Sequence, residues 1–155
     1  MFNQTTLTAL RALQQIVALD STQPVSPRQL AADIGESPSY LAKIARDLAK
    51  AGILRSENGS KGGVFLARKA DSITLQEIVE ACQGVVIGRF CVSDTSGNVC
   101  SFHEAALELH EAMVAVLRRW TLADLTSRPF VVRSGGVPCV MFGSRRAKEP
   151  QLVNL

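Results

Sequence analysis

The spacing of apolar residues predicts that most of this chain is helical. Between residues 25 and 66, two short amphipathic stretches flank a tight turn and are followed by a glycine-rich segment. The first stretch begins at Ser26 and Pro27, with Gln29 placed as the reciprocal partner of a capping box, and it stops at Gly35. Two short helices across a tight turn are typical of a helix-turn-helix.

The second stretch repeats the same start signals and ends at Gly52. Its apolar residues recur at spacings of three and four and form a buried stripe, made of Tyr40, Leu41, Ile44, Ala45 and Leu48. The opposite face is polar and basic, with Ser39, Lys43, Arg46 and Lys50. Such a face can contact DNA phosphates and base edges, although basic residues on a surface helix are often only solvated.

Two short strands are predicted at residues 53–56 and 63–67, around a turn rich in glycine. Ser60, Lys61 and Gly62 at the turn are placed to approach a phosphate or a minor groove. A nucleotide-binding loop is the alternative, but GSKGG lacks Walker spacing and a strand follows it instead of a helix. A hairpin after a helix-turn-helix predicts a winged helix-turn-helix, which binds duplex DNA. The residues of the second helix expected at the DNA are Ser37, Pro38, Ser39, Tyr40, Lys43, Arg46 and Lys50.

Further helices are predicted at residues 5–19, 75–82 and 101–120, and a short one at 121–125. Capping pairs support three of these starts: Thr74 with Glu77, Ser101 with Glu104, and Thr121 with Asp124.

The helix at 101–120 carries a seam of coiled-coil type and a second apolar strip at Leu107 and Val114. This is more apolar surface than one small domain needs to cover. The pattern therefore predicts a homodimer, although both strips could instead pack within one chain. The residues expected at the dimer contact are Leu109, Met113, Val116, Leu117 and Trp120.

Length and composition are those of one globular unit. The chain has 155 residues, 46% of them hydrophobic, and lacks an apolar run that could span a bilayer. The first ten residues do not resemble a secretory signal, so we expect a cytoplasmic protein without a membrane partner. No nucleophile-base-acid constellation, GxSxG or HExxH is present, which argues against an enzyme.

The charge is unevenly distributed along the chain. Residues 1–70 hold nine basic and five acidic side chains, residues 71–126 hold three and eight, and residues 127–155 hold five and one. A basic region joined to an acidic one fits a protein with one face turned toward DNA and another turned away.

Several motifs resemble the Rrf-two family of bacterial transcription regulators. They are Tyr40-Leu41, Gly52, the GGVFL segment at 62–66, in which Val64 departs from the usual aromatic, and Ile73-Thr74-Leu75. The resemblance covers roughly residues 4–126. It implies a mainly α fold with a small β-hairpin wing and a long dimerisation helix. It also implies a repressor whose paired heads read a pseudo-palindromic operator.

The resemblance divides the chain into four parts. Residues 1–83 correspond to the winged helix-turn-helix domain and residues 84–100 to a sensor loop. Residues 101–126 correspond to the dimerisation helix with the short helix after it, and residues 127–155 are a tail on which the family gives little guidance.

Many family members hold an iron-sulfur cluster through three cysteines and a histidine near the start of the long helix. Cys91, Cys100 and His103 match the first cysteine, the last cysteine and the histidine, while the middle cysteine is absent. The resemblance thus implies a cluster, with [2Fe-2S] favoured, whose remaining ligand comes from elsewhere. The signal would then be iron, redox state or nitric oxide.

Other roles for these thiols stay open. Cys91 and Cys100 could form a reversible disulfide or bind zinc, or the regulator could lack a cofactor and respond to a small ligand or a partner protein. A winged-helix adaptor that binds proteins instead of DNA is a further alternative. Cys82 is predicted to be a core residue, Cys139 has no assigned role, and His110 is expected on the helix surface.

Overall fold

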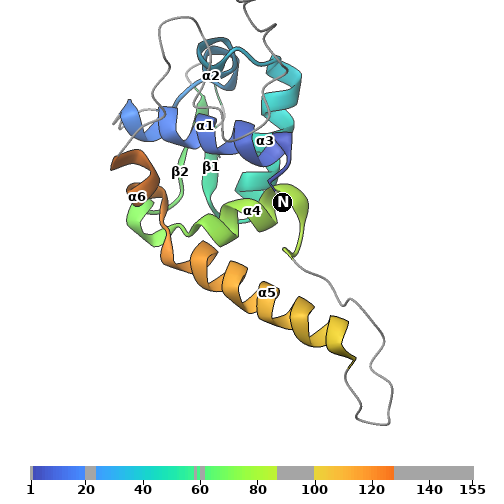
Figure 1. Cartoon of the computed structure of the whole chain (residues 1–155). Coiled ribbons are helices and arrows are strands. Elements are labelled where there is room, and N and C mark those ends of the chain that lie inside the picture. The colour runs from blue at the N-terminus through green and yellow to red at the C-terminus, as the bar shows by residue number, and fades with distance from the viewer. Residues whose placement is uncertain (1, 20–23, 58, 60–61, 87–99, 128–155) are drawn as a thin grey trace, which may run out of the picture.

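The computed structural model describes residues 2–19, 24–57, 59, 62–86 and 100–127. Within them the chain is mainly helical, with one antiparallel hairpin, which confirms the predicted fold class (Figure 1). The elements are α1 (Gln4–Ala18), α2 (Pro27–Ile34), α3 (Pro38–Lys50), β1 (Leu54–Glu57), β2 (Gly63–Leu66), η1 (Ala70–Ser72), α4 (Leu75–Gln83), α5 (Ser101–Arg119) and α6 (Leu122–Ser127).

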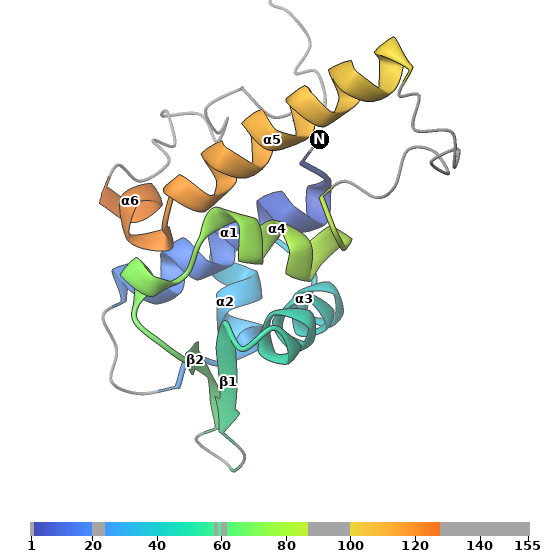
Figure 2. The same cartoon turned by 90° about the horizontal axis from the view of Figure 1, so that it is seen from below.

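The helices are arranged in layers between the hairpin and the long helix. Figure 2 shows α5 on one side of the molecule and the β1–β2 hairpin on the other, with α1 and α4 between them. The helices α2 and α3 lie on the hairpin side of α1. The helix-turn-helix and the wing therefore share one end of the molecule, while α5 lies at the opposite end.

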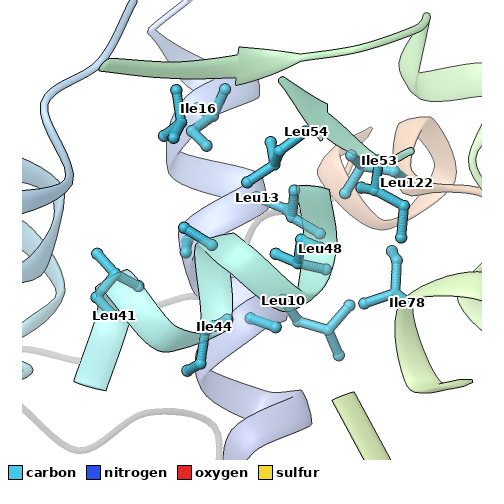
Figure 3. Close-up of a cluster of buried hydrophobic side chains, with 14 of the residues drawn as sticks. Leu10, Leu13, Ile16, Leu41, Ile44, Leu48, Ile53, Leu54, Ile78 and Leu122 are labelled. Carbon is cyan, nitrogen blue, oxygen red and sulfur yellow. The ribbon is translucent and has the colours of Figure 1, made fainter. Parts of the chain in front are cut away.

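One apolar core joins α1, α3, the hairpin, α4 and α6. Figure 3 shows side chains from all of these elements pointing toward one another. The side chains that are at most 1% exposed include Leu13, Leu41, Ile44, Leu48, Ile53, Ile78 and Leu122. The apolar stripe predicted on α3 is confirmed. Its burial against α1 and β1 determines which face of α3 remains in solvent.

The helix α3 begins and ends at the predicted signals. The Oγ of Ser37 accepts a hydrogen bond from the N–H of Tyr40 at 3.3 Å, and Pro38 occupies the first helical position. At the other end Gly52 has φ +70°. The N–H groups of Gly52 and Ile53 donate to the carbonyls of Ala49 and Leu48, which is a Schellman motif.

Two predicted capping boxes are wrong. Ser26 is the N-cap of α2, but its side chain makes no capping bond within the described chain. Gln29 instead donates one turn ahead to Asp33, at 2.9 Å. At α5 the N-cap is Cys100, so Ser101 is already the first helical residue and does not cap the helix.

The other two capping pairs are confirmed. At α4, Thr74 and Glu77 form a complete capping box. Before α6, Thr121 and Asp124 exchange equivalent bonds at 2.9 and 3.2 Å.

The first residue of β2 must be glycine because the backbone of the segment before α2 passes very close to it. The strands pair from Leu54–Leu66 to Glu57–Gly63, and Val64 also exchanges two backbone hydrogen bonds with Val25, each 2.9 Å long. A Cβ on Gly63 would lie 2.5 Å from the Val25 carbonyl oxygen. Only glycine fits there, and the segment before α2 is thereby tied to the wing.

Candidate nucleic-acid interface

The solvent face of α3 carries the residues expected at DNA. Ser39, Lys43, Arg46 and Lys50 are all exposed, while the opposite stripe is buried. Ammonium and guanidinium groups along one exposed helix face can neutralise phosphates and hydrogen-bond to guanine edges.

The N-terminal turn of α3 is also open to solvent. Ser37, Pro38 and Ser39 are exposed, and the two hydroxyl oxygens lie 3.5 Å apart. The first N–H groups of a helix and its dipole favour an anion. This end of α3 can therefore approach a DNA phosphate closely, without a bulky side chain in between.

Tyr40 is placed differently from the other residues expected at the interface. Its ring is half-buried against the core, and its hydroxyl donates to the Oγ1 of Thr5 on α1 at 3.1 Å. The side chain thus points into the molecule. Sequence spacing had already put Tyr40 on the buried stripe, but it gave no indication of the hydroxyl's partner.

The wing adds one cation that the sequence analysis did not single out. Arg55 is exposed on β1, directly across from Phe65 of β2, and its guanidinium carbon lies 3.9 Å from the ring centroid. This cation–π contact restrains Arg55 on the outer face of the hairpin. Gly62 is half-buried, and the other two predicted wing contacts, Ser60 and Lys61, lie outside the described residues.

Only part of the proposed ligand set falls within the described residues. Cys100 is exposed at the start of α5, His103 follows half-buried in its first turn, and the His103 N–H donates to the Cys100 carbonyl oxygen at 2.8 Å. Cys91 and Cys139 lie outside the described chain. Among the residues that are described, no three His, Cys, Asp or Glu side chains form a group that could hold a metal ion. A thiolate and an imidazole suit iron-sulfur ligation, but they supply only part of the ligands a cluster needs.

Cys82 packs against the core, as predicted. Burial and, to a smaller extent, the negative charge of Asp47 raise the pKa of its thiol to about 11, although a hydrogen bond with Thr6 acts in the opposite direction. The thiolate is the reactive form of cysteine, so this environment disfavours redox chemistry at Cys82.

The residues expected at the dimer contact are mostly uncovered. Leu117 is the one buried residue of α5, and Met113 is half-buried. Leu109, Val116 and Trp120 are 60%, 45% and 43% exposed. Between α5 and α4 lies an apolar groove of about 700 Å³, lined by Phe2, Val79, Val86, Leu109, Met113 and Val116 among others.

The helix-turn-helix, its exposed basic helix and the adjoining hairpin define a winged helix-turn-helix protein. No described helix is long and apolar enough to cross a membrane. Residues 2–128 match the profile of the Rrf2 family, described as iron-dependent transcriptional regulators. The chain belongs to the Rrf2 family of DNA-binding transcription regulators.

Individual relatives agree with this assignment. The Rrf2 protein of Nitratidesulfovibrio vulgaris is 36% identical over 121 residues, 74% of this chain and 79% of that protein. The regulator NsrR of Geobacillus kaustophilus is 31% identical over 132 residues, 81% and 89% of the two chains. The relatives carry the names of transcription regulators, which confirms the prediction that the chain is not an enzyme.

Solved structures show the same fold. The global cysteine regulator CymR of Bacillus subtilis superimposes with a TM-score of 0.68 at 24% identity, over 82% of this chain and 96% of that one. The structure of T. potens IscR superimposes with a TM-score of 0.62 at 24% identity, over 80% of this chain and 84% of that one.

Proposed function

We propose that this regulator is a homodimer that represses transcription by binding a pseudo-palindromic operator through α3 and the wing. The observation that carries the DNA-binding mode is the exposed row of Ser39, Lys43, Arg46 and Lys50 on a helix whose other face is buried. Placed in a major groove, this row would contact bases and the flanking phosphates. Two winged helix-turn-helix domains related by twofold symmetry would bind the two half-sites of such an operator.

The second copy is proposed to pack on α5. Phe102, Leu109 and Val116 follow one another at intervals of seven residues and are 71%, 60% and 45% exposed. Seven-residue spacing keeps apolar side chains on one side of a helix for a neighbouring helix to cover. The Nδ1 of His110 is also buried without a hydrogen-bond partner among the described residues, which a second subunit could supply. The His110 side chain as a whole is half-buried.

The signal is proposed to act at the base of α5. Cys100 and His103, together with Cys91, would bind an iron-sulfur cluster that responds to iron, redox state or nitric oxide. The match to a family described as iron-dependent supports this assignment. A conformational change at the N-terminus of α5 would alter the distance between the two DNA-binding domains of the dimer. A reversible Cys91–Cys100 disulfide in a cofactor-free regulator is the alternative, as is a small ligand or a protein partner.

DNA binding is tested with charge-removing variants on α3. Lys43→Ala and Arg46→Ala should each weaken binding to duplex DNA and lower the slope of log affinity against log salt by about 1 per lost phosphate contact. Arg119→Ala removes an equal charge from exposed α5 and should leave both quantities unchanged. If the folded wild-type protein shows no salt-dependent DNA binding, the chain is instead a protein-binding adaptor.

Iron binding is tested by anaerobic purification followed by visible absorption and by iron and sulfide assays. Wild type should contain iron and sulfide, Cys91→Ala should lose both, and the Cys82→Ala control should retain them. A dimer that binds DNA but contains no iron would exclude the cluster. The signal would then be assigned to thiol oxidation, a small ligand or a partner protein.

A further inference from the structure

A row of polar side chains on α1 holds the start of the recognition helix. Thr5, Thr8 and Arg11 are spaced three residues apart, so they lie along one side of α1. The hydroxyl oxygen of Thr5 accepts a hydrogen bond from the Tyr40 hydroxyl at 3.1 Å. The hydroxyl of Thr8 donates a hydrogen bond to the Glu36 carboxylate at 3.2 Å.

Arg11 strengthens the contact at Glu36. Its guanidinium lies 3.7 Å from the same carboxylate oxygen and also donates to the carbonyl of Ile34 at the end of α2. Thr8 is fully buried, and the Glu36 side chain is 21% exposed. The turn between α2 and α3 is therefore attached to α1 by directional bonds in a partly desolvated site.

The two attachments lie on either side of the exposed DNA-facing turn. Glu36 precedes Ser37, Pro38 and Ser39, and Tyr40 follows them. The apolar stripe of α3 holds the helix against the core, but apolar contacts have little directional preference. Hydrogen bonds at both ends of the turn fix where its N–H groups and hydroxyls point.

We propose that Tyr40 and Glu36 are positioning residues for operator recognition. Tyr40 acts through Thr5 and does not touch DNA, while Glu36 acts through Thr8 and Arg11. This inference rests on the proposed function, since it assigns roles within the same DNA-binding helix. If the bonds are lost, α3 samples further orientations, and the measured affinity falls with the fraction of molecules in the competent one.

The Tyr40–Thr5 pair allows a direct test, because each partner can be altered with almost no change in shape. Tyr40→Phe removes the donor and Thr5→Val removes the acceptor, whereas Thr5→Ser retains a hydroxyl at the same place. The probe is a 40-base-pair duplex carrying the site that wild-type protein selects from a random-sequence library, with a scrambled duplex for comparison. Fluorescence anisotropy measures affinity across a salt series, and circular dichroism checks the fold.

Tyr40→Phe and Thr5→Val should each weaken binding to the selected site roughly two- to tenfold, the effect of one net hydrogen bond. The double variant should lose no more than either single variant, because both changes break the same bond. Thr5→Ser should bind like wild type. Affinity for the scrambled duplex and the salt slope should not change, because no phosphate contact is lost.

A loss in Tyr40→Phe without a loss in Thr5→Val would overturn the inference, since the hydroxyl would then contact DNA directly. Wild-type affinity in both variants would overturn it as well, while leaving the proposed DNA binding intact. Failure of the wild-type protein to select any site would instead refute the proposed function, and this inference with it.

Discussion

The body of the molecule and the helix α5 differ in how completely they bury their apolar residues. In the body, Leu13, Ile44 and Ile78 from three different helices are at most 1% exposed. The 19 residues of α5 follow an equally clear apolar pattern, yet Leu117 is the one that is buried. Periodicity shows that a helix has an apolar face, but it does not show what covers that face. The body completes its own core, whereas α5 leaves several of its large apolar side chains in solvent.

The largest expected effect is the difference in stability between a leucine truncated in the core of the body and a leucine truncated on the surface of α5. Leu48→Ala should destabilise the fold by about 2–5 kcal/mol, because it leaves a cavity among side chains that are 1% exposed or less. Leu109→Ala should change stability by less than about 0.5 kcal/mol. Urea unfolding at a protein concentration that keeps the chain monomeric measures both values. Equal losses in the two variants would mean that α5 is part of the monomer's core.

The cysteines of the two regions should differ in reactivity. At pH 8 a thiol with the ordinary pKa of 9.0 is about one-tenth ionised, and raising the pKa to about 11 lowers that fraction roughly a hundredfold. In a Cys91→Ser/Cys139→Ser variant, iodoacetamide should therefore label exposed Cys100 much faster than Cys82, as followed by peptide mass spectrometry. In urea the two rates should become similar. Rapid native labelling of Cys82 would show that α4 opens readily from the body.

The association of two chains should depend on the exposed strip of α5. Val116→Asp places a charge in that strip and should raise the dimer dissociation constant by about thirtyfold or more, the effect of losing one central contact. Ala115→Asp puts the same charge on the neighbouring exposed position and serves as the control. Sedimentation equilibrium measures both constants. An unchanged dimer in Val116→Asp would assign the interface to another surface.

The smallest expected effect concerns the side-chain cap at the start of α4. Burial acts to raise the pKa of the Glu77 carboxyl, but hydrogen bonds from Thr74 and Arg68 and the charge of Arg68 lower it below 4.5. A lowered folded-state pKa adds stability above the unfolded pKa, and that stability is lost as pH falls through the folded value. Glu77→Gln should therefore cost about 1 kcal/mol at pH 7, and this difference should shrink as the pH falls below 4.5, measured by urea unfolding. A constant difference across this range would contradict the role of the charge.

Local signals predicted most of the helix boundaries, and their failures are informative. Ser37 and Thr74 form the predicted caps, and the partner of each lies within one turn of the chain. The Ser26 box fails because Gln29 finds Asp33 one turn further on. The box at Ser101 fails because Cys100 is the N-cap and Ser101 is already the first residue of the helix. Such competition between neighbouring bonds depends on atomic geometry, which residue spacing does not specify.

The candidate site was predictable to different degrees. The basic face of α3 follows from the position of its apolar stripe, so Lys43 and Arg46 could be assigned from spacing. The inward direction of the Tyr40 hydroxyl could not, because its partner Thr5 is 35 residues away in the chain. The Arg55–Phe65 contact likewise requires the register of the hairpin.

The sequence by itself determined that this protein has a helix-turn-helix with a wing, and that a long helix with an apolar face follows. These features depend on interactions within a few residues, such as caps, glycine turns and helical periodicity. Only the tertiary structure decided which polar groups pair between distant helices and which apolar face remains uncovered. Both depend on how separate elements pack in space, and that packing places Tyr40 against α1 while leaving Leu109 in solvent.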